Sequence, residues 1–411
     1  MKFGLLGRTL GHSFSPRIHS ALGNTNYELF EREPSQLQEF FADPELQGIN
    51  ITIPYKVNAL ETCDVVDPRA ERIGCVNTMV RKDGKWHGYN TDYDGFVFTL
   101  QHAGIDVSGK ECIILGDGAS SATVHVALED LGAKNIVHLS RKTAPFYGDA
   151  PNYYETAQII INCTPIGMYP HNPANLIDIT QFSKLEGVVD LIYNPRRTIL
   201  LLQAEMMEIP HCDGLPFLVA QGVEAANHFQ GESFGTKEIE QILRDMRREK
   251  ENIILIGMPG VGKTTVGKAL GEEMGRTCVD VDQELEKEIG DISTYITEQG
   301  EPAFRKKEAE TIAKLGTETG LVISTGGGCV TVPKNYAHLR QNGRIYQLTQ
   351  PVENLSTSGR VLSSGGIEHL RELEATRTPM YESFAQCIVE HNRNAPETVA
   401  AILEDFEANL L

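Results

Sequence analysis

The chain has no long apolar run, no paired cysteine motif and no excess of positive charge. No stretch of its 411 residues approaches the roughly 20 apolar residues of a membrane span, and residues 1–7 lack the apolar core of a signal peptide. The eight cysteines are scattered without a C-x-x-C pair, so neither a zinc site nor a disulfide framework is indicated. We therefore expect a protein of the reducing cytoplasm.

The charge balance narrows the range of partners. The 37 Lys and Arg residues are outnumbered by 56 Asp and Glu residues, which gives a formal net charge of −19. Nucleic acids and anionic membrane surfaces require basic patches, so we expect neither as a partner and predict small-molecule substrates. Residues 244–251 form one dense cluster of mixed charge, which at helical spacing indicates a solvated helix face. The length predicts two or three domains.

What the chain does have is a phosphate-binding loop late in its sequence. An apolar run at residues 253–256 leads into Gly-Met-Pro-Gly-Val-Gly-Lys-Thr at 257–264. In such a loop the glycines let backbone N–H groups surround phosphates, Lys263 reaches the outer oxygens, and Thr264 can hold Mg²⁺ at a helix N-terminus. We predict nucleotide contacts at Gly260, Val261, Gly262, Lys263, Thr264 and Thr265.

A second glycine turn follows the apolar strand at residues 112–115 and precedes a helix that continues to about Leu131. The next strand ends in Ser-Arg-Lys rather than in an acidic residue, which favours the 2′-phosphate of NADP over the ribose hydroxyls of NAD. Within the turn, Asp117 would repel a pyrophosphate unless its side chain points to solvent. We predict NADP contacts at Gly116, Asp117, Gly118, Ala119, Ser120, Ser140, Arg141 and Lys142.

Further motifs lie on either side of this turn. They are Gly-His-Ser-Phe-Ser-Pro at 11–16, Asn-Ile-Thr-Ile-Pro-Tyr-Lys at 50–56, Gly-Cys-Val-Asn-Thr at 74–78, Gly-Tyr-Asn-Thr-Asp at 88–92, and three more at 162–168, 190–193 and 214–221. In this order and spacing the chain closely resembles shikimate dehydrogenase from residue 1 to about 230. The resemblance implies an α/β substrate domain at 1–95, completed by 215–245, and a Rossmann-type NADP domain at 96–214.

Lys56 and Asp92 are the pair that we predict to carry the first reaction. Hydride transfer to a ketone needs a proton donor at the carbonyl oxygen, and a lysine beside a carboxylate can be held charged and oriented for that task. The resemblance implies that Lys56 is the acid/base group and that Asp92 is its neighbour and touches substrate. It further implies carboxylate contacts from Ser13, Ser15 and Tyr193, hydroxyl contacts from Thr52, Asn77 and Gln221, and cofactor contacts from Leu191 and Gly214.

Residues 252–411, after a predicted linker at 246–251, resemble shikimate kinase. The matching motifs are the phosphate loop and residues 279–282, 304–308, 324–328, 359–362 and 377–381. We expect alternation along a strand to place Asp280 and Asp282 on one edge, facing the phosphates. The resemblance implies a P-loop α/β domain with a parallel sheet. It assigns the acceptor hydroxyl to Asp282, Mg²⁺ to Asp280 and Thr264, the substrate carboxylate to Arg305 and Arg377, the ring to Gly327, and the phosphates to Arg360.

Two segments depart from these families. Residues 141–162 are too short for a helix usual in the nucleotide domain, and the lid segment 352–366 is short and altered in sequence. The first departure affects cofactor contacts beyond the phosphate. The second affects the closure of the lid.

The two halves predict consecutive reactions of the shikimate pathway, with NADPH, ATP and Mg²⁺ as cofactors. One would reduce 3-dehydroshikimate to shikimate, and the other would phosphorylate shikimate. Three alternatives remain open: a quinate/shikimate dehydrogenase that uses NAD, a kinase for another small acceptor such as gluconate or a nucleotide, and a half that has lost catalysis and only binds a ligand. Arg141 speaks against the first, Arg305 with Arg377 against the second, and intact Lys56 and Lys263 against the third. The oligomeric state stays open, a homo-oligomer included.

Overall fold

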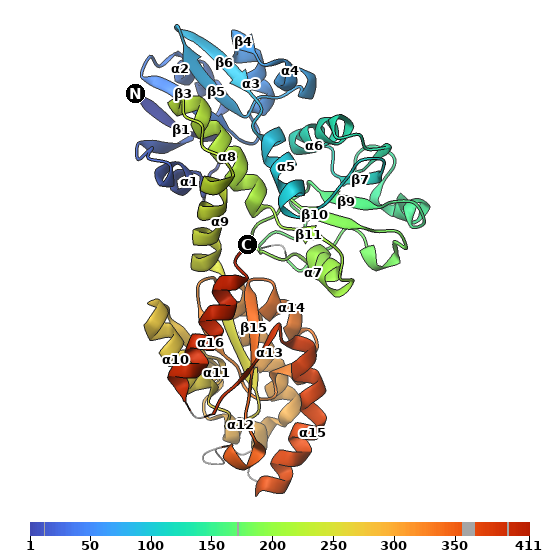
Figure 1. Cartoon of the computed structure of the whole chain (residues 1–411), viewed down its shortest axis with the longest axis vertical. Helices are drawn as coiled ribbons and strands as arrows, with labels where there is room; N and C mark the ends of the chain where they lie inside the picture. The colour runs from blue at the N-terminus through green and yellow to red at the C-terminus, as the bar shows by residue number, and fades with distance from the viewer. Residues whose placement is uncertain (12, 171, 356–365, 393) are drawn as a thin grey trace. The chain divides into compact units, whose positions relative to one another are not determined.

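The computed structural model describes all residues except 12, 171, 356–365 and 393, and it divides into two compact units (Figure 1). The first unit is Met1–Leu243 and the second is Arg244–Leu411. Three sheets carry the fold, two in the first unit and one in the second. Helices accompany each sheet, so the predicted α/β class is confirmed.

The first sheet is mixed and has the strand order β2-β1-β3-β5-β6-β4. Parallel pairs join β1 to β2 and β3, whereas β3, β5 and β6 pair antiparallel. Its strands are β1 (Lys2–Gly7), β2 (Tyr27–Glu31), β3 (Leu46–Ile51), β4 (Val65–Val66), β5 (Thr78–Lys82) and β6 (Lys85–Tyr89). Its helices are α1 (Ser15–Ala21), α2 (Leu37–Ala42), α3 (Lys56–Thr62) and α4 (Pro68–Ile73). Apolar residues such as Leu6, Ile49 and Met79 fill the core of this layer.

The second sheet is entirely parallel, with the order β11-β10-β9-β7-β8. Its strands are β7 (Glu111–Leu115), β8 (Asn135–Leu139), β9 (Ile159–Asn162), β10 (Gly187–Asp190) and β11 (His211–Cys212), and its helices include α6 (Ala119–Asp130) and α7 (Ile199–Met206). Strands β9 and β10 are buried along their whole length, as expected for a parallel sheet covered on both faces. The short segment between β8 and β9 contains a 3₁₀ helix at Tyr147–Tyr153.

Two long helices connect these sheets. They are α5 (Asp92–His102) and α8 (Leu215–Gln230), which pack closely because Gly95 has no side chain: a Cβ there would lie 2.8 Å from the Phe217 carbonyl oxygen. Toward its other end α8 contacts the first sheet, where the ring of Phe229 fills the space that a Cβ on Gly48 would occupy. The chain therefore returns to the first sheet after the second, as the sequence predicts.

The third sheet, in the second unit, is parallel with the order β13-β14-β12-β15-β16. Its strands are β12 (Asn252–Gly257), β13 (Cys278–Asp280), β14 (Val322–Ser324), β15 (Gly343–Thr349) and β16 (Cys387–Glu390). Its helices are α10 (Lys263–Met274), α11 (Val281–Ile289), α12 (Ile292–Gln299), α13 (Glu301–Thr317), α14 (Asn335–Arg340), α15 (Gly366–Phe384) and α16 (Ala395–Ala408). The central strand β12 is fully buried and leads directly into the phosphate loop. The predicted parallel sheet is present.

The segment predicted as a linker is helical. Helix α9 spans Thr236–Lys250 and crosses the boundary between the two units. Within the second unit, Arg247 is buried and donates from Nη1 to the Leu410 carbonyl oxygen at 3.0 Å, and Arg244 donates to the Glu407 carbonyl oxygen at 3.1 Å. These arginines satisfy carbonyl groups at the end of α16 that have no partner within that helix. Part of the charge cluster is therefore packed rather than solvated.

Two negative findings concern the described residues. None of their helices combines the length and the apolar character needed to cross a membrane. All eight cysteines are free: Cys75, Cys112, Cys212 and Cys329 are buried and the other four are partly exposed.

Candidate active sites

Lys56 and Asp92 meet in the first unit. Lys56 begins α3 just after strand β3, and Asp92 begins α5 just after strand β6. The Lys56 ammonium donates to Asp92 Oδ2 at 2.5 Å, and the two side chains are only 12% and 6% exposed. A charged pair shielded in this way has a fixed geometry, because few water molecules compete for either partner. The pair can hold a proton at a defined point at the edge of the sheet.

The Asp92 carboxylate has a second donor in Asn77. The Asn77 amide donates from Nδ2 to Asp92 Oδ1 at 2.9 Å, and its Oδ1 accepts the backbone N–H of Thr91 at 2.8 Å. Because a backbone N–H can only donate, this contact fixes which end of the amide faces the carboxylate. Each oxygen of Asp92 thus has a donor of its own.

The other predicted substrate residues come from several elements. Ser15 is buried at the start of α1, and its backbone N–H donates to Ser13 Oγ at 3.2 Å. The ring of Tyr193 packs on Phe14, between these serines, with centroids 5.5 Å apart, and burial raises the pKa of Tyr193. The structure therefore brings Tyr193 to the serine turn.

Thr52 and Gln221 come from different elements of the first unit. Thr52 follows β3, and its backbone N–H donates to the Leu6 carbonyl oxygen at 2.9 Å. Gln221 lies on α8 against Gly95 of α5, one turn after Asp92, and its side-chain amide donates to the Leu218 carbonyl oxygen. Gln221 is thus close to the helix that presents Asp92.

The first glycine turn leads from β7 into α6, as predicted. Gly116 has a φ of 120°, which residues with a side chain rarely adopt, and a Cβ there would lie 3.0 Å from Ser121 Oγ. Gly118 has open space at its Cβ position. Asp117 is exposed, so its carboxylate can remain hydrated. The turn can therefore accept a phosphate group without burying that carboxylate beside it.

The residues after β8 divide into two kinds. Ser140 is buried, and its Oγ accepts the backbone N–H groups of Lys142 and Thr143 at 3.1 and 3.0 Å, so it holds the turn together. Arg141 and Lys142 are exposed at that turn.

Gly214 lies against the backbone of Leu191, where a Cβ would be 2.0 Å from the Leu191 carbonyl oxygen. The close approach of these two predicted cofactor residues requires glycine at 214.

The phosphate loop of the second unit runs between β12 and α10. Gly257, Gly260 and Gly262 have φ values of 140°, 83° and 98°, so the loop conformation depends on glycine at each position. Lys263 is buried, and its ammonium donates to the carbonyl oxygens of Gly257 and Met258 at 2.8 and 3.0 Å. The ammonium is thus held against the backbone of the phosphate loop.

Asp280 and Asp282 do not share a strand, contrary to the sequence prediction. Strand β13 ends at Asp280, which caps helix α11, and Asp282 lies in the first turn of that helix. Asp280 Oδ1 accepts the backbone N–H of Asp282 at 3.1 Å, and its Oδ2 accepts the Thr264 hydroxyl at 2.7 Å. Alternation fails here because the carboxylate of Asp280 satisfies the free N–H groups of a helix start. The Asp280 carboxylate and the Thr264 hydroxyl are nevertheless in contact.

Three consecutive glycines make room for the remaining polar groups of this site. A Cβ on Gly326 would lie 2.6 Å from Glu308 Oε1 and 2.8 Å from Asp282 Oδ1, and a Cβ on Gly328 would lie 2.2 Å from Arg305 Nη2. The Gly327 carbonyl oxygen accepts from Arg377 Nη1 at 3.1 Å. Asp282, Arg305 and Arg377 therefore surround this turn, as the sequence predicts.

Glu308 is a residue of this site that the sequence prediction missed. Its carboxylate is fully buried and accepts from Arg305 Nη1 at 2.9 Å, while its other oxygen has no hydrogen-bond partner in the described structure. Burial raises the pKa of Glu308, and the adjacent Arg305 opposes that shift. The sequence feature that could have identified Glu308 is its position three residues after Arg305 on α13. This spacing puts both residues on one helix face.

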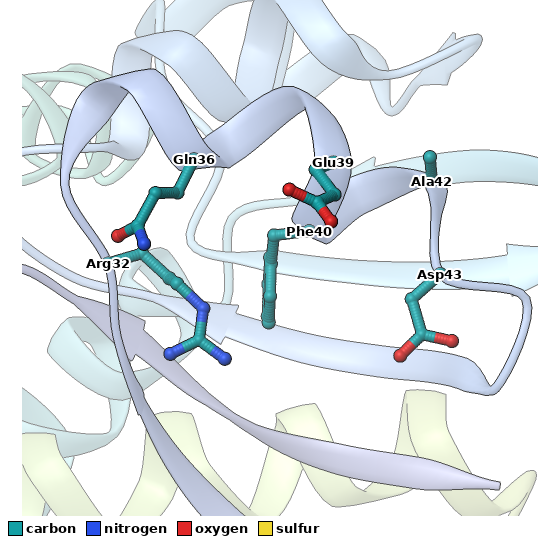
Figure 2. Close-up of a pocket in the computed structure, with 6 residues that line it drawn as sticks. All are labelled: Arg32, Gln36, Glu39, Phe40, Ala42 and Asp43. Atoms are coloured by element: carbon teal, nitrogen blue, oxygen red, sulfur yellow. The ribbon is translucent and has the colours of Figure 1, made fainter.

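Two features remain, a predicted residue outside the described structure and a surface hollow. Arg360 falls within residues 356–365, outside the described structure, as does most of the predicted lid. A surface hollow beside α2 is lined by none of the predicted site residues (Figure 2). In it the Arg32 guanidinium lies 5.4 Å from the centre of the Phe40 ring. The residues that line the hollow are Arg32, Gln36, Glu39, Phe40, Ala42 and Asp43.

Comparison with known proteins covers both units. The family model described as shikimate dehydrogenase substrate binding domain matches residues 5–79. A shikimate dehydrogenase (NADP(+)) of Clostridium perfringens is 35% identical over 265 residues, which cover 60% of this chain and 98% of that protein. The corresponding protein of Clostridium beijerinckii is 36% identical over 249 residues and is covered to 91%.

The chain belongs to the shikimate dehydrogenase family. Among solved structures, a chorismate mutase/shikimate 5-dehydrogenase fusion protein from Clostridium acetobutylicum has a TM-score of 0.56 and 32% identity, with 59% of this chain and 96% of that chain covered. The shikimate 5-dehydrogenase of Thermus thermophilus, solved with NADP(H) and shikimate, has a TM-score of 0.53 and 28% identity, with 60% and 99% covered. Each match covers nearly the whole of the solved dehydrogenase chain.

The second unit carries a shikimate kinase domain, because the family model of that description matches residues 259–407. This dehydrogenase chain is therefore fused to a kinase domain, as the motifs predict. Residues 259–407 include the phosphate loop, Asp282, Arg305 and Arg377. The roles of the individual residues in both sites remain predictions.

Proposed function

We propose that this chain reduces 3-dehydroshikimate to shikimate with NADPH in its first unit and phosphorylates shikimate to shikimate 3-phosphate with ATP in its second. The observation that carries this proposal is the presence of both sites in one chain that matches both families. Reduction creates the hydroxyl that phosphorylation then uses. We further expect the enzyme to work in the cytoplasm, and a homo-oligomer is compatible with the proposal.

In the reductase site, Lys56 donates the proton. When bound, NADPH supplies the hydride for the ketone carbon, and the open space at Gly118 with exposed Arg141 and Lys142 suits a phosphorylated dinucleotide. Transfer of hydride leaves negative charge on the carbonyl oxygen, and an oriented ammonium lowers the energy of that charge. Asp92 contributes by holding the Lys56 ammonium in one place. This arrangement supports Lys56 as the acid and Asp92 as its partner.

In the kinase site, catalysis rests mainly on positioning the reactants and on neutralising the negative charge of the phosphoryl group. ATP with Mg²⁺ supplies the phosphoryl group, and the adjacent Thr264 hydroxyl and Asp280 carboxylate are ligands of the kind that Mg²⁺ prefers. The guanidinium groups of Arg305 and Arg377 can donate charge-assisted hydrogen bonds to a carboxylate on the acceptor. Asp282 is within reach of the same glycine turn and can accept the proton of the acceptor hydroxyl. These contacts support an acceptor that carries both a carboxylate and a ring hydroxyl.

The deciding experiment is a coupled assay on the purified chain. 3-Dehydroshikimate, NADPH, ATP and Mg²⁺ are supplied while NADPH oxidation and shikimate 3-phosphate are followed. Both should proceed in the wild-type chain. Accumulation of unphosphorylated shikimate would contradict the kinase assignment, and absence of NADPH oxidation would contradict the reductase assignment.

Two variants provide matched controls for that assay. Lys56→Ala should abolish reduction and leave phosphorylation of added shikimate unchanged, whereas Lys263→Ala should do the reverse. If one unit only binds its ligand, the alanine substitution in that unit would not change the activity of the chain. Replacing NADPH by NADH, and shikimate by quinate or gluconate, separates the proposal from a quinate/shikimate dehydrogenase and from a kinase for another acceptor.

A further inference from the structure

A line of buried polar side chains leads from the Asp92 carboxylate into the interior of the first unit. Asn77 Nδ2 donates to Asp92 Oδ1 at 2.9 Å, the Thr78 hydroxyl donates to Asn77 Oδ1 at 3.1 Å, and Asn50 Nδ2 donates to Thr78 Oγ1 at 2.9 Å. All four residues are at most 5% exposed. Every step of the line therefore lies where water cannot replace a lost partner.

At its inner end the line is held by two donors. Asn50 Oδ1 accepts the Tyr27 hydroxyl at 2.7 Å and lies 3.1 Å from His19 Nε2. The rings of His19 and Tyr27 stack with centroids 4.0 Å apart. With the Asn50 carbonyl oxygen facing both rings, its amide N–H₂ faces the Thr78 hydroxyl.

The donors of this line all point toward Asp92. The Thr91 backbone N–H fixes the Asn77 amide at the outer end, and the Asn50 carbonyl oxygen contacts the Tyr27 hydroxyl and the His19 ring at the inner end. Between them the Thr78 hydroxyl accepts from Asn50 and donates to Asn77, and it also lies 3.2 Å from the Thr91 hydroxyl. Hydrogen bonds in such a series polarise one another, which strengthens the last one.

His19 is suited to this place because it stays neutral. Its ring is fully buried, and its Nδ1 has no hydrogen-bond partner in the described structure. Burial lowers the pKa of His19 to about 3. Its Nε2–H therefore remains a donor across the pH range in which an enzyme of the cytoplasm works.

We propose that Thr78 and Asn50 are positioning residues for the reduction, acting through Asn77 to hold the Asp92 carboxylate in the orientation that aims Lys56. The proposal rests on the reductase function proposed above and assigns to it two residues that contact neither substrate nor cofactor in that scheme. Without the Thr78 hydroxyl, Asn77 keeps its contact with Thr91 but loses the polarised series behind it. Asp92 and Lys56 then sample more orientations, which slows turnover more than it weakens binding.

The test compares Thr78→Val with Thr78→Ser in the full-length chain. Valine has the shape of threonine without the hydroxyl, whereas serine retains the hydroxyl. We expect Thr78→Val to lower kcat for reduction by about tenfold or more while KM for 3-dehydroshikimate changes less than threefold, and Thr78→Ser to stay within threefold of wild type. Equal kcat values for valine and wild type, or equal losses for valine and serine, would overturn the proposal.

Controls within the same molecule separate positioning from damage to the fold. Phosphorylation of added shikimate should be unchanged in each variant, because the second unit carries that site. Tyr27→Phe removes a hydroxyl from the same network but leaves His19 to hold Asn50, so kcat should fall less than threefold. If Tyr27→Phe were as slow as Thr78→Val, loss of any buried hydrogen bond would suffice and the positioning role would be wrong.

A second variant covers the case in which Thr78→Val does not fold. Asn50→Leu removes the donor to Thr78 one step further from Asp92, and it should show the same fall in kcat at nearly constant KM. If both variants fold, their effects should not add in the double variant, because they interrupt one series. Full additivity would contradict the proposal. A wild-type chain that fails to reduce 3-dehydroshikimate would instead contradict the reductase function itself.

Discussion

At the scale of single residues, the kinase site depends on glycines, which have no side chain to occupy the space around them. The three glycines at 326–328 leave space that Asp282, Glu308, Pro259 and Arg305 fill. Of these contacts the tightest is at Gly328, where a Cβ would overlap the Arg305 guanidinium. The backbone there has a φ of −103°, which any residue can adopt. A substitution at this position therefore displaces a functional group without straining the chain.

We predict that Gly328→Ala weakens the binding of shikimate to the kinase. The added methyl group pushes the Arg305 guanidinium aside, because the end of a long side chain moves more easily than backbone. Loss of one charge-assisted hydrogen bond should raise KM for shikimate by about tenfold or more, with melting of the protein little changed. Steady-state kinetics of phosphorylation measure this effect.

Gly235→Ala is the matched control, since no atom lies within 4 Å of a Cβ at that glycine. It should leave KM for shikimate unchanged. Unaltered kinetics in Gly328→Ala would show that Arg305 does not bind the acceptor in the position described.

At the scale of elements, helix α11 links the capping of a helix to the predicted metal site. Asp280 both accepts the Asp282 N–H group in the first turn of α11 and accepts a hydrogen bond from the Thr264 hydroxyl of α10. Asparagine has a carbonyl oxygen that can cap a helix but lacks the negative charge. The two tasks of Asp280 can therefore be separated by substitution.

We predict that Asp280→Asn raises the Mg²⁺ concentration needed for half-maximal phosphorylation by about tenfold or more, because a neutral amide attracts the ion less than a carboxylate does. The cap should survive, so the free energy of unfolding of the second unit should change by less than about 1 kcal/mol. Asp280→Ala should lose both properties. A Mg²⁺ titration of kinase activity decides the matter, and an unchanged titration in Asp280→Asn would exclude Asp280 from the metal site.

The sequence predicted the elements of this protein better than their ends. Strand–turn–helix patterns located both glycine turns, since the period of apolar residues changes from strand to helix there. The same pattern misplaced Asp282, because alternation cannot tell whether a strand ends one residue earlier in a helix cap. It also made a linker of residues 246–251, yet Arg247 in that segment donates to the Leu410 carbonyl oxygen, 163 residues away along the chain.

The buried network around Thr78 was beyond the sequence for a related reason. Asn50 and Thr78 lie within motifs that the resemblance identified, yet nothing in their order shows that they are buried and bonded to each other. His19 and Tyr27 carried no motif signal for such contacts. Pairs brought together by a sheet can be predicted only once the register of its strands is known.

At the scale of the whole molecule, the second unit includes the end of helix α9. Arg247 is buried and bonds the Leu410 carbonyl oxygen, whereas its neighbour Arg248 is exposed and pairs with the Glu407 side chain. A buried donor to an otherwise unpaired carbonyl contributes more than an exposed ion pair. The two arginines are thus a natural comparison.

We predict that Arg247→Met destabilises the kinase unit by about 1–3 kcal/mol, because it leaves the Leu410 carbonyl group without its donor. Arg248→Met should cost less than about 1 kcal/mol. Heating the chain and measuring the loss of each activity distinguishes the units. Kinase activity should be lost at a lower temperature in Arg247→Met. Equal midpoints for the two variants would contradict a structural role of α9 in the second unit.

The free cysteines have a consequence for the durability of the enzyme. Burial raises the pKa of Cys63, Cys112 and Cys329 to about 12, and it also raises the pKa of Cys75, Cys163, Cys278 and Cys387. Peroxide and alkylating reagents attack the thiolate form, so these thiols react slowly while the chain is folded. We therefore expect thiol oxidation to contribute little to the loss of either activity while the chain stays folded.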